Sequence, residues 1–299
     1  MGLAILAVFV LCAVYVQARG RLQHTKFSRR MNDHANFLAP INCLFYSFNR
    51  GKNTPYVQLE RFPELQVLED NWEIIRDEAL QLNQEAQIKA SSAYDDLGFN
   101  SFFRRGWKRF YLKWYGANLP SAQQLCPKTL ALLDPIKSVK GAMFAMLPPG
   151  SELTRHRDPY AGSFRYHLGL VTPNSDDCYL CVDGERYAWR DGEAVMFDET
   201  YLHYAKNDTD QNRIILFLDV KRPVWLFLVD WLNEGFSRLV MSASATKNLE
   251  GDKVGLLNRL FGAVYRLRLC GKKLKTFNQP LYYFAQYALY AALIYWIFF

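Results

Sequence analysis

The sequence predicts a mostly β core of two packed sheets or a closed barrel, with flanking helices and membrane-embedded helices at both termini. Between residues 140 and 222, short strand-like runs alternate with turn residues and no helical pattern separates them, which is typical of double-sheet and barrel architectures. The first 18 and the last 19 residues are apolar and contain no charged side chain, as membrane segments require. The strand-like runs are GAMFAML, SFRYHLGLV, CYLCV, ERYAW, EAVMF and RIILFLDV.

The length and composition allow one good-sized core with apolar additions. Of the 299 residues, 50% are hydrophobic and 15% aromatic, which excludes a disordered or a fibrous protein. We expect five parts: an N-terminal membrane helix (1–18), a lead-in of helix and strand (19–139), the β core (140–222), amphipathic helices at a membrane surface (223–280) and a C-terminal transmembrane helix (281–299).

The net charge of +7 favours an anionic partner, either nucleic acid or a phospholipid surface. The apolar ends favour the lipid surface, so no nucleic-acid partner is predicted. The six cysteines are scattered and indicate reduced thiols in a domain facing the cytosol. Cys178 and Cys181 lie three apart in a predicted strand, so their side chains point to opposite faces, which favours a structural role over zinc binding.

The two ends predict the same membrane topology. The last 19 residues would span about 28 Å as a helix, close to the hydrocarbon thickness of a bilayer; the alternative is a buried core helix. Basic residues follow the first segment and precede the last, and by the positive-inside rule both clusters face the cytoplasm. These residues are Arg19, Arg21, Lys26, Arg29 and Arg30 at one end, and Arg266, Arg268, Lys272, Lys273 and Lys275 at the other.

Two stretches, 223–240 and 254–268, carry apolar residues at helical spacing. Asp230 and Glu234 would each cost a few kcal/mol at the middle of a bilayer, so the first stretch should not span it. Both are predicted as amphipathic helices that lie on a membrane surface or on the β core, and the pattern alone does not choose between these. In the lead-in, residues 60–90 are predicted as helical, and a period-two pattern from Gly106 predicts a strand.

A candidate metal site begins with His156 and Asp158, which lie two residues apart and point to the same side of an extended chain. His203, on a later strand, would complete two nitrogens and one oxygen, a set that leaves open positions as Fe(II) oxygenases require. Taken singly, the His-x-Asp pair could be a surface loop and His203 a core histidine bonded to a neighbour.

Arg213 strengthens the metal-site interpretation. Residues 201–219 are predicted as strand, turn and strand, and a hairpin centred on Asp208 makes His203 and Arg213 direct cross-strand neighbours. Arg213 would then face an apolar wall, where its charge requires an anionic partner such as a dicarboxylate. The alternative is an arginine that reaches solvent. Arg165 and His167 share a strand face and could aim at the near carboxylate of the same ligand, or form an ordinary polar face.

Taken together, these motifs resemble the aspartyl/asparaginyl β-hydroxylase family. The pattern comprises His156-x-Asp158, Arg165-x-His167-Leu-Gly-Leu, Phe197-Asp198 followed by His203, and Arg213, with Pro63-Glu-Leu to Asn-Trp72 and Cys126-Pro-Lys-Thr upstream. Within the family the chain looks most like the bacterial lipid A fatty-acyl 2-hydroxylases. The animal members that modify proteins lack the metal carboxylate, so Asp158 departs from their pattern and puts a protein substrate in doubt.

The resemblance implies a double-stranded β-helix (jelly roll) with Fe(II), 2-oxoglutarate and O2. His156, Asp158 and His203 take the metal-ligand roles, and Arg213, Arg165 and His167 the co-substrate contacts. The implied reaction is 2-hydroxylation of a fatty-acyl chain of lipid A, at the cytoplasmic face of the bacterial inner membrane.

A basic segment after residue 103 could contact the phosphates of such a lipid, with an aromatic residue at headgroup level; the alternative is a solvated strand face. Its candidate substrate residues are Arg104, Arg105, Trp107, Lys108 and Arg109. Two other functions stay open: an oxygenase acting on Asp or Asn residues of a protein, and a non-catalytic membrane-anchored β domain.

Overall fold

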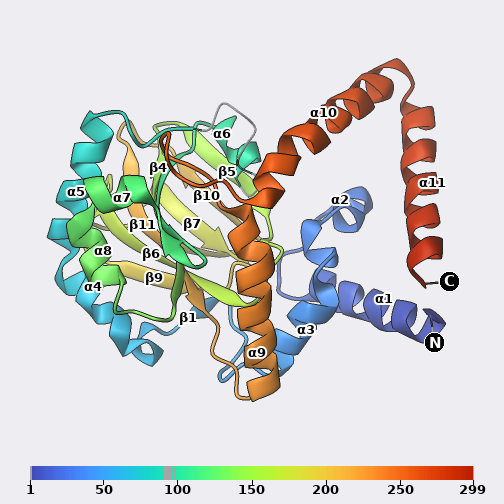
Figure 1. Ribbon diagram of the computed structural model, residues 1–299, viewed down its shortest axis with the longest axis horizontal. Coiled ribbons are helices and arrows are strands. Elements are labelled where there is room, and N and C mark those ends of the chain that lie inside the picture. The colour runs from blue at the N-terminus through green and yellow to red at the C-terminus, as the bar shows by residue number, and fades with distance from the viewer. Residues whose placement is uncertain (1, 91–95, 97–98, 299) are drawn as a thin grey trace.

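The computed structural model describes residues 2–90, 96 and 99–298, and two antiparallel sheets form its centre (Figure 1). The large sheet has the strand order β1-β9-β6-β11-β4-β2-β3, and the small sheet has the order β5-β10-β7-β8. This confirms the predicted double-sheet β core. The strands are β1 (Tyr56–Val57), β2 (Lys108–Trp114), β3 (Ala117–Asn118), β4 (Val139–Leu147), β5 (Ser151–His156), β6 (Ser163–Val171), β7 (Cys178–Val182), β8 (Glu185–Ala188), β9 (Ala194–Phe197), β10 (His203–Asn207) and β11 (Arg213–Lys221).

The central strands of the large sheet are buried on both faces, which explains their nearly continuous apolar sequences. In β6, Arg165 and His167 line a pocket between the sheets, whereas Tyr166 and Leu168 alternate with them and belong to the opposite face. That opposite face is covered by α5 (Trp72–Gln84), in contact with β6, and by α8 (Pro127–Leu133), which packs on α5. The helix predicted over residues 60–90 is present mainly as α5, which ends at Gln84, and the strand predicted from Gly106 is present as β2.

The remaining helices lie around the sheets, and those near the two chain ends gather on one side of the molecule (Figure 1). They are α1 (Gly2–Ala18), α2 (Phe27–Met31), α3 (Ala39–Ser47), α4 (Gln66–Asp70), α6 (Asn100–Phe103), α7 (Pro120–Leu125), α9 (Phe227–Phe236), α10 (Leu256–Phe277) and α11 (Gln279–Phe298). A second apolar cluster joins α1 and α3 to α9 and includes Val16, Phe45 and Val229.

The ends of the chain are helical as predicted, but the prediction that they span a membrane is corrected. In the part of the chain that the structure describes, no helix combines the length and the apolar character needed to cross a bilayer. Helix α1 has 17 residues, and α11 contains two glutamines and five tyrosines, which lower its mean hydropathy. The alternative of a buried C-terminal core helix is not seen either, because most described side chains of α11 are exposed.

The two predicted amphipathic helices are present as α9 and α10. Helix α9 buries Val229 and Asn233 and leaves a row of large apolar side chains exposed on its other side. This exposed set comprises Phe227, Leu228, Trp231 and Leu232, and Trp225, just before the helix, is exposed as well. Helix α9 therefore packs on the protein and also presents an apolar surface to its surroundings.

Candidate metal centre and co-substrate pocket

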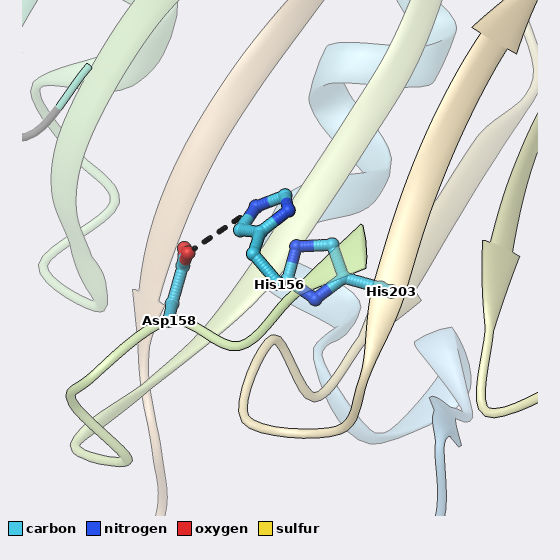
Figure 2. Close-up of side chains that lie close together, drawn as sticks. All are labelled: His156, Asp158 and His203. Carbon is cyan, nitrogen blue, oxygen red and sulfur yellow. Dashed lines mark ion pairs between the residues drawn. The ribbon is translucent and has the colours of Figure 1, made fainter. Parts of the chain in front are cut away.

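The three predicted metal ligands come together at one end of the small sheet (Figure 2). His156 ends β5, His203 begins β10, and the two are cross-strand partners; Asp158 lies two residues beyond β5. Their candidate ligand atoms all lie within 4.8 Å of one another, and theirs is the one such group found among the described residues. Cys178 and Cys181, which are buried free thiols, are not part of it.

The backbone fixes which nitrogen of each histidine is free. His156 Nδ1 lies 2.7 Å from the carbonyl oxygen of Thr154, and His203 Nδ1 lies 3.0 Å from that of Tyr201. A carbonyl can only accept, so each Nδ1 carries the proton and each Nε2 presents its lone pair. Burial and the neighbouring His156 lower the pKa of His203 to about 3, so its ring is neutral and suited to bind a metal.

Asp158 is held as a carboxylate by its neighbours. Burial alone would raise its pKa, but the positive charge of Arg165, with Nη2 2.7 Å from Oδ2, holds the pKa below its ordinary value. The backbone N–H of Asp158 donates to the Glu199 carbonyl at 2.9 Å. Asp158 is thus oriented through both its main chain and its side chain.

Arg165 is surrounded by carboxylates. Besides Asp158, its Nε lies 3.2 Å from Glu199 Oε2 and 3.0 Å from Asp219 Oδ1. Burial raises the pKa of Glu199 to about 8 and that of Asp219 above its usual value. The positive charge of Arg165 is therefore balanced within the protein, and the predicted contact between Arg165 and a co-substrate stays a prediction.

Arg213 has the opposite environment. It is 2% exposed, its Nε and Nη2 have no hydrogen-bond partner among the described residues, and its guanidinium lies 4.4 Å from the centre of the Trp189 ring. Burial without a nearby carboxylate lowers its pKa to about 10. His167, in the same pocket, also has both ring nitrogens unpartnered, and burial with Arg213 holds its pKa well below the usual range. Together these groups form a buried polar site whose charge suits an anion.

The predicted hairpin between His203 and Arg213 is wrong. His203 lies on β10 of the small sheet, opposite His156 and Val182, whereas Arg213 begins β11 of the large sheet, opposite Leu147. The turn is a corner that carries the chain from one sheet to the other. Asn207 holds this corner, because its Nδ2 donates to the carbonyls of Leu147, Pro148 and Gln211. The two residues nevertheless line the same pocket, from opposite sheets.

The rest of the pocket is largely apolar. Phe102 lies nearest the metal ligands, with its ring centre 4.8 Å from that of His156. The other apolar lining residues are Phe99, Trp107, Ala145, Leu153, Leu180, Trp189, Phe197, Ala205, Ile215 and Phe217. The arrangement can hold a metal at one end, an anion at Arg213, and a hydrocarbon group against Phe102.

The basic segment is only partly what the sequence predicts. Arg109 is buried in an ion pair of 3.0 Å with Asp96, and Trp107 lines the pocket, so neither is free to meet a lipid surface. Arg104 and Arg105 are exposed and Lys108 is half-buried; Arg105 pairs with Glu152 at 3.3 Å. The correction has a physical reason: Asp96 reaches Arg109 from outside the strand, and strand periodicity does not reveal such a contact.

Sequence reasoning missed the two buried acids that contact Arg165, Glu199 and Asp219, and the aromatic pocket residue Phe102. Glu199 directly follows the recognised Phe197-Asp198 motif, and Asp219 is an acid inside an otherwise apolar strand. A buried charge in such a strand requires a partner, and that signal could have found Asp219.

Two antiparallel sheets bring together two histidines and a carboxylate, a ligand set that could hold a single metal ion. Residues 69–223, about half of the chain, match the profile of the family described as Aspartyl/Asparaginyl beta-hydroxylase. The chain belongs to this family of hydroxylases.

The chain is similar to two curated hydroxylases and, more weakly, to one solved structure. An ornithine lipid ester-linked acyl 2-hydroxylase of Rhizobium tropici is 39% identical over 119 residues, which are 40% of this chain and 42% of that protein. The human aspartyl/asparaginyl beta-hydroxylase is 29% identical over 177 residues, 58% of this chain and 22% of that protein. A prolyl-4-hydroxylase structure from Pseudomonas putida covers 52% of this chain and 87% of its own at 18% identity, with a TM-score of 0.37, a likeness too weak to bear on the fold. The chain thus spans less than half the length of these two curated relatives.

Proposed function

We propose that this protein is an Fe(II)- and 2-oxoglutarate-dependent dioxygenase that 2-hydroxylates a fatty-acyl chain of lipid A. The observation that carries the proposal is the unpartnered, buried Arg213 in the same pocket as His156, Asp158 and His203. A buried guanidinium next to a two-histidine, one-carboxylate set fits a co-substrate that chelates a metal at one end and carries a carboxylate at the other.

The residues fit the iron and the co-substrate. His156, His203 and Asp158 would hold Fe(II) through two Nε2 atoms and one carboxylate oxygen, and Arg213 and His167 would bind 2-oxoglutarate. When bound, these groups and O2 supply the oxidising power to hydroxylate a C–H bond, one oxygen atom entering the product and the other succinate, with loss of CO2. In this assignment the 140–222 core is a double-stranded β-helix.

The protein's own part is to orient and to exclude water. The carbonyls of Thr154 and Tyr201 keep both histidines in the metal-binding tautomer, and Arg165 orients the carboxylate of Asp158. Burial strengthens the attraction of Arg213 for a carboxylate, because no solvent screens its charge.

The pocket wall supports an acyl chain as the substrate. Phe99, Phe102, Trp107 and Leu153 suit a hydrocarbon and offer no charge to an Asp or Asn side chain. Of the two arginines that line the pocket, Arg165 is balanced by carboxylates, and we assign Arg213 to the co-substrate. These observations favour a lipid over the alternative of a protein Asp or Asn residue. The unpartnered cation also disfavours a non-catalytic β domain.

The exposed apolar residues of α9, with Phe27 and Met31 on α2, support attachment to a membrane surface. Basic residues lie beside this surface, with Arg29 and Arg30 on α2. We propose that the protein binds the cytoplasmic face of the bacterial inner membrane, with residues 223–280 among its surface helices and lipid A as its lipid partner.

A second substrate is favoured by one comparison. The relative from Rhizobium tropici is described as acting on an ester-linked acyl chain of an ornithine lipid, and it is 39% identical over its matched part. The chemistry on the acyl chain would be the same, and only the headgroup would differ.

Reconstitution of the full chain tests the proposal and separates the substrates. Purified protein is supplied with Fe(II), 2-oxoglutarate and O2 together with lipid A, ornithine lipid or an Asp-containing peptide. We expect succinate release coupled to oxygen insertion in the acyl chain of lipid A. If oxygen is inserted only in ornithine lipid, that lipid and not lipid A is the substrate. If oxygen is inserted only in the peptide, a lipid substrate is refuted. If succinate release is not coupled to any of the three, the proposed function is refuted.

A further inference from the structure

The side chain of Arg19 lies inside the protein, beside the loop that joins β9 to β10, although Arg19 directly follows α1. Only 8% of the residue is exposed, and its guanidinium lies 3.9 Å from the ring centres of both Tyr46 and Tyr201. Its Nη2 donates to Asp198 Oδ2 at 2.7 Å, and its Nη1 donates to Thr200 Oγ1 at 2.5 Å. Arg19 therefore contacts three residues of this loop.

The same loop, residues 198–201, orients two of the candidate metal ligands through its main chain. The Glu199 carbonyl accepts the backbone N–H of Asp158 at 2.9 Å. The Tyr201 carbonyl lies 3.0 Å from His203 Nδ1 and so sets the tautomer and the ring orientation of that histidine. A displacement of the loop would move both ligands.

The backbone after Arg19 is also held tightly against Asp183 and Tyr201. Gly20 has a φ of +87°, and a Cβ atom at this position would lie 2.6 Å from Asp183 Oδ1 and 2.9 Å from Tyr201 Cδ1. The backbone N–H groups of Arg21 and Leu22 donate to the Asp183 carboxylate at 2.9 and 2.8 Å. Only glycine permits this approach.

A second contact joins the N-terminal segment to residues 156–158, which include two of the candidate metal ligands. Arg157, which lies between the ligands His156 and Asp158 in the sequence, is 4% exposed. Its Nη1 donates to Asp33 Oδ2 at 3.2 Å and to Gln17 Oε1 at 3.3 Å. The N-terminal segment therefore contacts both the 156–158 segment and the 198–201 loop, although it lies outside the 69–223 family match.

We propose that Arg19 is a positioning residue for the metal site: through Asp198 and Thr200 it fixes the loop whose carbonyls orient Asp158 and His203. The inference rests on the proposed metal-binding function of these ligands. Since Arg19 immediately follows α1, the same contacts connect the N-terminal helix to the metal site. Asp198 also pairs with Arg222 at 2.9 Å, so it keeps a cation when Arg19 is replaced.

Titration of the metal-free full chain with Co(II), followed by visible absorption, tests the role of Arg19 without requiring activity. We expect Arg19→Ala to weaken Co(II) binding by about 10- to 100-fold, the usual range for residues that orient metal ligands. Arg21→Ala is the matched control, because the Arg21 side chain is 78% exposed and pairs only with Glu185 among the described residues. This control should bind Co(II) as the wild type does.

Thr200→Val adds a nearly isosteric change that removes the hydroxyl, which accepts from Arg19 and donates to Asp198. We expect it to weaken Co(II) binding in the same direction as Arg19→Ala. Wild-type Co(II) affinity in both Arg19→Ala and Thr200→Val would overturn the positioning role, and if Arg19→Ala does not fold, Thr200→Val alone decides. Absence of Co(II) binding by the wild type would instead refute the metal site itself, so the two failures are distinct.

Discussion

Arg165 and Asp158 are joined by an ion pair of 2.7 Å, and the same guanidinium lies within 3.2 Å of Glu199 and Asp219. Arg165 thus links a candidate metal ligand to two further buried acids. Removal of the arginine leaves three carboxylates that burial disfavours and that repel one another. The stability of the fold and the orientation of the metal ligand therefore depend on one side chain.

Arg165→Met should consequently lower the free energy of unfolding by about 3–5 kcal/mol, the cost typical of breaking a buried ion pair by removing one partner. Urea denaturation of the metal-free protein measures this. Arg155→Met is a suitable control, since Arg155 is exposed. A change below about 1 kcal/mol, the range of surface pairs, would show that the cluster is not held by Arg165.

Arg213→Met should abolish binding of 2-oxoglutarate and leave the ligand-free protein equally or more stable. The reason is that the buried charge has no ion-pair partner in the part of the chain that the structure describes, so its removal costs no ion pair and relieves desolvation. Thermal unfolding with and without 2-oxoglutarate, in the presence of Mn(II), measures both effects. Equal stabilisation of the variant and the wild type by 2-oxoglutarate would contradict the assignment.

The metal-free protein should lose stability as the pH falls below about 6.5, and His167 should contribute to that loss. Burial and Arg213 hold the pKa of folded His167 well below its ordinary value, whereas the unfolded residue takes up a proton near pH 6.5. The unfolded state then binds more protons, so acid favours unfolding. Denaturation of the wild type and His167→Asn at pH 7.5 and 5.5 measures the difference. An unchanged pH dependence in the variant would refute the contribution of His167.

Phe102→Ala should raise the KM for the acyl substrate while the affinities for metal and 2-oxoglutarate stay unchanged. Loss of a buried phenyl contact costs about 1.5–3 kcal/mol, roughly a 10- to 100-fold loss in kcat/KM. Phe103→Ala is the matched control, because Phe103 is also half-buried but does not line the pocket. Equal effects of the two substitutions on KM would exclude a specific substrate contact for Phe102.

Much of the fold was predictable because periodicity is a local property. The alternation of Arg165 and His167 with Tyr166 and Leu168 is visible in the sequence, and it correctly assigns them to opposite faces of one strand. The pairing of strands is not local. The hairpin was mispredicted because Asn207 holds a corner, and only its contacts with Leu147 and Pro148 reveal that the chain changes sheets.

The same distinction holds for the site. His156, Asp158 and His203 were predictable because their types and spacing match the needs of a metal ion. The contact of Arg19 with Asp198 joins residues 179 positions apart, and nothing near Arg19 in the sequence indicates it. From the sequence alone, Arg19 is more simply interpreted as part of the basic cluster that flanks a membrane segment. The burial of Arg109 against Asp96 was hidden for the same reason.

We propose that the His156–Asp158–His203 site hydroxylates the acyl chain of a membrane lipid. The mass spectrum of lipid A from bacterial cells that express the wild type or Asp158→Ala at equal levels measures this directly. We expect an acyl species heavier by one oxygen atom with the wild type and its absence with the variant. A lipid A spectrum without that species in wild-type cells, or with it in the variant, would refute hydroxylation of lipid A by this site.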